Sequence, residues 1–203
     1  MSYLISAVRN PVPGKTQQLL KTVVSDFENN IGRGIVTLGT SGQIIGNTPV
    51  DSADSLEKIQ DAFLQGDHPA AESLAKQEAD CSEPIKFLIR EIVAQLDPSK
   101  RPSDPKYMQR FIMQSKPGEA VDLLDALLKN HEISGGSFNI SAIAGNPGRL
   151  IMTRPLAHFN EVRKATEMKA LREDFKSRGG VDMFQHAASV EGRVARIVYI
   201  NLD

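Results

Sequence analysis

The stretch YLISAVRNPVPGKTQQLLKTVV, residues 3–24, decides the fold because YMQRFIMQSKPGEAVDLLDALL, residues 107–128, repeats its pattern. In both stretches a tyrosine opens an apolar run, a Pro-Gly pair ends that run, and two pairs of aliphatic residues follow. Further matched segments are 42–45 with 148–151 and 90–96 with 196–202. The chain therefore carries the same unit twice, and a repeat has to be interpreted before any single element.

The composition indicates a soluble protein of a reducing compartment, and we expect it in the cytoplasm. The 203 residues include 24 basic and 25 acidic side chains, so the formal charge of -1 gives no general attraction for nucleic acid or an anionic membrane. The single cysteine, Cys81, excludes an intrachain disulfide and a metal site built on several thiolates. The first residues lack the basic region of a signal peptide, and no apolar run approaches the roughly 20 residues of a membrane span.

The apolar patterns predict the element order β-α-β-β-α-β in each half. In the first half we expect strands at 3–9, 35–40, 43–47 and 85–96, a helix through 19–27, a helix capped by Asp51 or Ser52, and a short helical piece at 70–79. In the second half we expect strands at 107–113, 138–144, 149–153 and 194–202, a helix through 121–131, a helix beginning near Pro155, and a short helical piece at 181–187.

That order predicts an α+β protein made of two tandem ferredoxin-like units. Each unit would be an antiparallel sheet with helices on one face, and the open faces would pack on each other within one chain. We expect unit boundaries at 1–97 and 106–203, joined by a linker at 98–105. The three prolines of the linker predict a stiff, extended connector that reaches about 25 Å.

A tandem of such units resembles the dimeric α/β barrel superfamily in its fused form, over residues 3–202. The Asp67-His68-Pro69 break after the second helix is similar to a kink in many members, and the layout is similar to the NIPSNAP-like and antibiotic-biosynthesis-monooxygenase-like branches. The resemblance implies a ligand pocket between sheet and helices of one unit, or between the sheets. It implies one of several activities: cofactor-free oxygenation of polycyclic phenols, haem binding or degradation, lactone isomerisation, or none.

Two symmetric residue pairs are candidate ligand-binding groups. Tyr3 and Tyr107 begin matching strands and are expected to donate hydrogen bonds to a ligand, or to seal the barrel ends with wet hydroxyls. Arg90 and Arg196 also match, and are expected to grip an anion or to form ion pairs at the sheet rim with Glu83, Glu91 or Glu191.

The second copy is the more polar one, which makes it the better candidate for the working half. Arg110 is a further candidate ligand-binding residue there. His158 and His186 are candidate acid-base groups, because the pKa of histidine suits proton transfer near neutrality, or haem ligands. No histidine spacing supports a metal site with several ligands, so we expect no metal.

These observations predict a small-molecule enzyme or binder with an apolar pocket, in the first place a cofactor-free monooxygenase or an isomerase-like protein. The alternatives are a non-catalytic ligand-binding or assembly module and a haem-binding protein. The expected partners are a small apolar organic molecule and a second copy of the chain in a homodimer. With only 5% aromatic residues and no Trp, we do not expect base stacking as in RNA-binding sheets.

Overall fold

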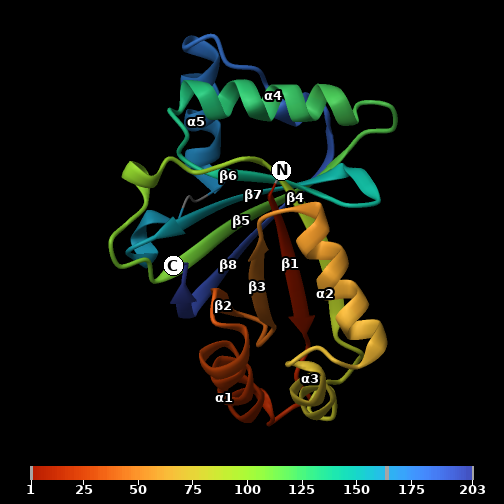
Figure 1. The fold of residues 1–203 in the computed structure, drawn as a ribbon. Coiled ribbons are helices and arrows are strands. Elements are labelled where there is room, and N and C mark those ends of the chain that lie inside the picture. The colour runs from red at the N-terminus through yellow and green to blue at the C-terminus, as the bar shows by residue number, and fades with distance from the viewer. Residues whose placement is uncertain (1, 163–164, 203) are drawn as a thin grey trace. The chain divides into compact units, whose positions relative to one another are not determined.

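The computed structural model describes residues 2–162 and 165–202 (Figure 1). The chain divides into two compact units. Unit 1 comprises Met1–Glu91 and Ala195–Asp203, and unit 2 comprises Ile92–Val194. The chain passes between the units within two strands, β4 (Lys86–Ala94) and β8 (Ala187–Asn201).

Unit 1 has the element order that its apolar pattern predicts. Its elements are β1 (Ser2–Arg9), α1 (Thr16–Asp26), the π-helical turn η1 (Phe27–Ile31), β2 (Gly34–Gly39), β3 (Ile44–Val50), α2 (Ala53–Gln65) and α3 (Ala71–Glu78). The side chain of Ser52 accepts a hydrogen bond from the Ser55 backbone N–H at 3.1 Å, which confirms Ser52 as the cap of α2. Strand β3 pairs antiparallel with β1 and with β2, and β2 also pairs with the last part of β8.

Unit 2 repeats this order with one longer strand. Its elements are η2 (Pro98–Lys100), β5 (Tyr107–Ser115), α4 (Ala120–Ile133), β6 (Asn139–Ile143), β7 (Asn146–Leu156), η3 (Phe159–Glu161), α5 (Ala165–Ser177) and η4 (Met183–Gln185), followed by the first half of β8. Strand β7 pairs antiparallel with β5 and with β6.

Two expectations for unit 2 are wrong. No helix begins near Pro155, because β7 continues with Pro155 opposite Met108, and this extension buries Leu156 to 2% exposure. The linker is not fully extended either. Pro98–Lys100 forms a 3₁₀ turn, because the Asp97 side chain accepts the Ser99 backbone N–H at 2.9 Å.

The fold is α+β, as expected. The eight strands are hydrogen-bonded in the order β1-β3-β2-β8-β5-β7-β6-β4, which closes a barrel. None of the helices within the described residues is long and apolar enough to cross a bilayer.

The two units differ in how completely their cores are filled. In unit 2 a cluster of buried side chains joins β5, β6 and β7 to α4 and η4; it consists of Phe111, Met113, Leu123, Ala126, Leu127, Phe138, Ile140, Leu150, Met152 and Met183. In unit 1 the corresponding cluster is smaller and lies under α1; it consists of Leu19, Val23, Phe27, Val36 and Ile44. Helix α2 contributes no buried residue, so unit 1 is less densely packed on that side.

Candidate functional site

Unit 1 contains a cavity of about 200 Å³ between its sheet and its helices. Strands β1, β3 and β4 supply one wall, and η1, α2, α3 and the turn between α2 and α3 supply the other. The lining is mostly hydrophobic, and its polar side chains are Arg9, Asn30, Thr48 and His68. An apolar cavity with a few polar groups is the usual form of a small-molecule site.

Small residues border the cavity at one rung of the unit 1 sheet, that is, at one pair of opposite residues on neighbouring strands. Ala7 of β1 lies opposite Gly46 of β3, and both line the cavity. At the matching rung of unit 2, Phe111 lies opposite Met152, and both are buried in the filled core. A methyl group added at Gly46 would lie 2.8 Å from the ring of Phe27, so this position has no room for a side chain unless Phe27 shifts. The two units thus pair their strands in the same way, but at this rung the side chains on the helix-facing side of the sheet are smaller in unit 1 than in unit 2.

Arg9 occupies the next rung and is the most deeply buried charged group of the cavity, with 2% of its surface exposed. Its Nε donates to Gln77 Oε1 at 2.6 Å, and its Nη1 donates to the Ala7 backbone oxygen at 3.0 Å. Burial lowers the pKa of Arg9 to about 10, against the opposing influence of Cys81 and Asp26. The guanidinium therefore remains charged at neutral pH.

A chain of hydrogen bonds through Gln77 and Asp26 fixes the orientation of the Arg9 side chain. Gln77 of α3 is 1% exposed, and its Nε2 donates to Asp26 Oδ2 at 3.2 Å and to Ser73 Oγ at 3.0 Å. Asn30 donates to the other Asp26 oxygen at 2.6 Å. Because the amide nitrogen of Gln77 is committed to acceptors, its oxygen has to face Arg9. Asp26 thus orients the guanidinium through Gln77 instead of pairing with it directly.

His68 supplies a second polar group. Its ring stacks on Phe63, with centroids 3.8 Å apart and planes 12° apart, and its Nδ1 accepts the Ala70 backbone N–H at 3.1 Å. Burial lowers the pKa of His68, although Asp26 acts in the opposite direction. The ring is therefore neutral at pH 7 with its proton on Nε2, which makes Nε2 a hydrogen-bond donor.

None of the seven residues that the sequence points to lines this cavity. Tyr3 and Tyr107 are half-buried, and the ring of Tyr107 packs edge-on against Phe159 at 5.4 Å. Arg110 lies in β5 with 7% exposure, opposite Thr153.

The matched arginines have different surroundings. Arg90 is 5% exposed, and its Nε and Nη2 donate to Ser6 Oγ at 3.1 Å and Asn47 Oδ1 at 2.7 Å. Arg196 is exposed, opposite Leu38. Glu83 and Glu191 form ion pairs with Lys86 and Arg193 respectively.

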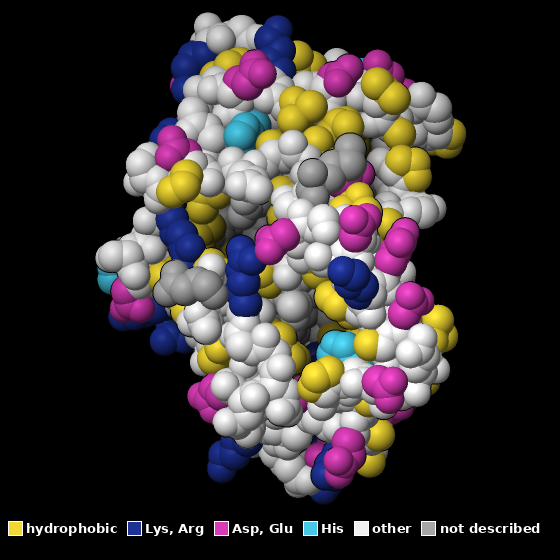
Figure 2. Space-filling view, viewed as in Figure 1, with side chains coloured by type: hydrophobic (Ala, Val, Ile, Leu, Met, Phe, Trp, Pro, Cys, Tyr) yellow, Lys and Arg dark blue, Asp and Glu magenta, His cyan; other side chains and the backbone are white. Residues whose placement is uncertain are grey.

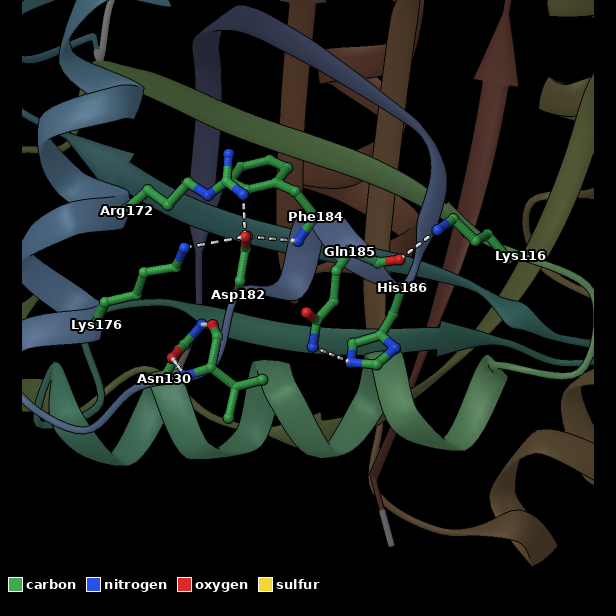
Figure 3. Close-up of polar contacts among 9 residues, drawn as sticks. Lys116, Asn130, Arg172, Lys176, Asp182, Phe184, Gln185 and His186 are labelled. Atoms are coloured by element: carbon green, nitrogen blue, oxygen red, sulfur yellow. Dashed lines mark hydrogen bonds and ion pairs between the residues drawn. The ribbon is translucent and has the colours of Figure 1, made fainter.

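The two candidate histidines lie in unit 2 and act at helix ends. His158 is exposed and caps η3, where its backbone N–H donates to Glu161 at 2.7 Å. His186 follows η4, and its Nδ1 lies 3.0 Å from Glu119 Oε2. Its Nε2 lies 2.8 Å from the Gln185 side chain (Figure 3). Both ring nitrogens of His186 are thus engaged with polar partners.

Beside His186, an ionic cluster secures η4 to α5 (Figure 3). The carboxylate of Asp182 forms ion pairs with Arg172 and, at 3.4 Å, with Lys176. It also accepts a hydrogen bond from the Phe184 backbone N–H at 3.3 Å. Burial raises the pKa of Asp182, but the hydrogen bonds and charges of Arg172 and Lys176 outweigh burial and lower it overall. The side chains are committed to one another, which is the arrangement of a structural contact.

The described residues contain no group of three or more metal-ligating side chains. Haem requires an accessible ligand beside a large cavity. Of the histidines, His68 lines the unit 1 cavity, whereas His158 and His186 do not. The volume of about 200 Å³ is below the range of about 300–1,000 Å³ that drug-sized ligands occupy, and haem is larger than such ligands. The cavity therefore does not fit haem.

The sequence contains a signal for the cavity that polarity alone does not reveal. The matched strands pair Arg9 with Met113 and Ala7 with Phe111, so the first copy has a charge and a small residue where the second has large apolar ones. His68 lies in the Asp67-His68-Pro69 break. The smaller side-chain volume at these strand positions in the first copy is the sequence signal that indicates a cavity in unit 1.

No family model matches the chain, and no curated protein matches it. Solved structures resemble it over nearly its full length. An anthrone oxidase-like protein is 12% identical, with 98% of this chain and 91% of that one covered and a TM-score of 0.65. A candidate monooxygenase from Fusobacterium nucleatum subsp. nucleatum is 8% identical, with 100% and 94% covered and a TM-score of 0.72. A candidate monooxygenase from Lactobacillus acidophilus is 10% identical, with 96% and 93% covered and a TM-score of 0.59. These likenesses show that the chain has the dimeric α/β barrel fold that its repeat predicts.

Proposed function

We propose that this chain is a monooxygenase-like enzyme that oxidises a small organic molecule in the unit 1 cavity without a resident cofactor. The observation that carries the proposal is Arg9, a charged donor with 2% exposure at the wall of an otherwise apolar cavity. The names of the fold neighbours, an anthrone oxidase-like protein and candidate monooxygenases, favour the same reaction class. Fold alone does not assign an activity, so the argument depends on the site.

The residues of the cavity suit a reaction that passes through a substrate anion. The positive charge of Arg9 favours the ionised form of a bound phenol or enol, and the Nε2–H of His68 is a second donor for the developing oxyanion. The hydrophobic lining excludes water from an electron-rich ring. Molecular oxygen then accepts four electrons: one oxygen atom becomes a carbonyl on the substrate, two hydrogens leave the substrate, and the second oxygen atom leaves as water.

The two units favour an active site over the assembly alternative. If the repeat served only to complete the barrel, both helix-facing cores would be filled by apolar side chains. Unit 2 matches that description, whereas unit 1 has a cavity at the rung of Ala7 and Gly46. We infer that unit 2 is the scaffold half and unit 1 the ligand-binding half.

Several further properties belong to the same proposal. We propose that residues 1–97 and 106–203 are two ferredoxin-like units of a fused barrel, that the protein works in the cytoplasm, and that it forms a homodimer. We also propose that Tyr3, Tyr107, Arg110, Arg90 and Arg196 do not contact the substrate, because the cavity lining excludes them.

Oxygen consumption tests the proposed reaction. The purified protein is incubated with a panel of one- to three-ring phenols and anthrone-like ketones, with an oxygen electrode and mass spectrometry of the product. We expect uptake of one oxygen molecule for each added carbonyl, and a loss of roughly 100-fold or more in Arg9→Met, the order of effect seen when a donor to an oxyanion is removed.

Arg33→Met is the matched control, because Arg33 is an exposed arginine of unit 1 that pairs with Asp51 at 3.1 Å. It should retain the wild-type rate. Equal rates in Arg9→Met and wild type, or no oxygen uptake with any member of the panel, would refute the proposal.

A further inference from the structure

We propose that the unit 1 cavity selects a compact organic monoanion, one or two rings bearing an ionised oxygen that binds Nη2 of Arg9. This inference rests on the proposed function, from which it takes the cavity and the contact between Arg9 and an ionised oxygen. It adds the size of the ligand, the nitrogen atom that binds it, and a preference in binding for an anion over a neutral molecule of the same shape.

The first step is the hydrogen bonding of Arg9. Its Nε and Nη1 donate to Gln77 and to the Ala7 backbone oxygen, which leaves Nη2 as the nitrogen without a partner among the described residues. No fully buried side-chain nitrogen or oxygen in the described part of the chain lacks a partner, so Nη2 is not sealed inside protein. Because Arg9 is 2% exposed and lines the cavity, the accessible part of the guanidinium faces the cavity.

The second step is charge. Arg9 forms no ion pair among the described residues, and its nearest buried carboxylate, Asp26, reaches it only through Gln77. The thiol of Cys81 is uncharged at neutral pH, because burial raises its pKa against the lowering effect of Arg9. A buried cation without a direct counter-ion is costly, on the order of several kcal/mol. An anion in the cavity offsets that cost, and a neutral ligand of the same shape does not.

On one face of the molecule, the surface charges do not supply such selectivity. On the face shown in Figure 2, Lys and Arg side chains are interspersed with Asp and Glu side chains, so positive charge is not gathered there. The formal net charge of -1 likewise gives no general attraction for an anion, which leaves recognition to a local group such as Arg9.

The third step is size. A cavity of about 150 Å³ holds benzene. The cavity here is about 200 Å³, which leaves room for slightly more than one ring. A ligand with three fused rings needs more room than this cavity has.

The fourth step is the comparison between the copies. Arg9 lies opposite Ile44 in β1 and β3, and Met113 lies opposite Leu150 in β5 and β7. Met113 is fully buried in the filled core of unit 2. The same position of the sheet thus accepts an apolar side chain, so the fold itself does not require an arginine there.

Titration calorimetry without oxygen tests this inference. The probes are benzoate and naphthoate, with benzamide and naphthamide as neutral molecules of nearly the same shape. We expect the anions to bind wild type about 10- to 100-fold more tightly than the amides, the range expected of a charge-assisted hydrogen bond. The preference should vanish in Arg9→Met, persist in part in Arg9→Lys, and remain unchanged in the Arg33→Met control.

Equal affinity for acid and amide in wild type overturns the inference, as does a preference that survives in Arg9→Met or an absence of binding at millimolar concentrations. If Arg9→Met does not fold, Arg9→Lys and the acid-to-amide ratio in wild type decide the question. Anion binding without oxygen uptake would support this inference and refute the proposed oxidation. Oxygen uptake without a preference for the anion would support the proposed oxidation and refute this inference.

Discussion

Exchanging the residues at one matched position, Arg9→Met in unit 1 and Met113→Arg in unit 2, should have very different effects on stability. Arg9→Met removes two hydrogen bonds from a cation, worth about 1.5–3 kcal/mol each. It also removes a desolvated charge: a pKa of about 10 corresponds to a cost on the order of 3 kcal/mol for the charged form. Burying methionine adds about 1.5 kcal/mol or more. These terms nearly cancel, so we expect a change within about 2 kcal/mol.

Met113→Arg has no such compensation. Met113 is 0% exposed in a filled cluster that holds no polar side chain, so the new guanidinium would lose its hydration without a partner. We expect a loss of about 4 kcal/mol or more, a large share of the about 5–15 kcal/mol that stabilises a typical domain.

Urea unfolding followed by circular dichroism measures both variants. With a slope of about 2 kcal/mol per molar urea, a loss of about 4 kcal/mol lowers the midpoint by about 2 M. Met113→Leu is the control for packing alone and should cost less than about 1.5 kcal/mol. Equal losses in Arg9→Met and Met113→Arg would refute the view that only unit 1 is built to hold a charge.

Three further outcomes follow from the described contacts. Ala7→Phe, which installs the residue of the matching rung, should fill the cavity and weaken naphthoate binding by calorimetry more than about tenfold while circular dichroism is unchanged. Asp182→Ala should lower the free energy of unfolding by about 1–2 kcal/mol, because it removes two cationic partners and a cap, whereas Asp174→Ala, which breaks one exposed pair, should cost less than about 0.5 kcal/mol. Burial lowers the pKa of His68 in the folded protein, so its contribution to stability is present above a pH of about 6.5 and is lost as the pH falls through the lowered pKa. In His68→Phe, the urea midpoint should therefore depend less on pH between 7.5 and 5 than it does in wild type.

The fold was predictable because it depends on patterns that repeat. The alternation of Tyr3–Arg9 and the aliphatic stripe through Leu19 and Val23 recur in the second copy, and both stripes are buried in the structure. The end of β7 was not predictable in the same way. A proline at position 155 indicates a helix start as readily as a strand, and burial of Leu156 decides for the strand.

The candidate site was harder to predict, because the polarity of a side chain does not reveal its surroundings. His158 is exposed at the start of η3, so its polarity reflects a surface position. His186 contacts Glu119 and Gln185, partners that come from separate segments and cannot be identified from spacing.

Differences of volume on a shared face are more informative than differences of polarity. A sheet position that faces a helix has a fixed space to fill, because protein interiors are packed to nearly constant density. Where one copy places Phe111 and Met152 and the other places Ala7 and Gly46, the difference in volume has to be taken up by a neighbouring side chain, by a shift of a helix or by a cavity. The ring of Phe27 takes up part of it above Gly46. Here α2 has no buried residue and the cavity is present, so the helix did not close the gap. A duplicated protein under selection only for stability would be expected to fill that gap in both copies, since an empty apolar cavity costs on the order of 20 cal/mol per Å³. The persistence of the cavity beside a charged Arg9 is therefore best explained by a ligand that occupies it.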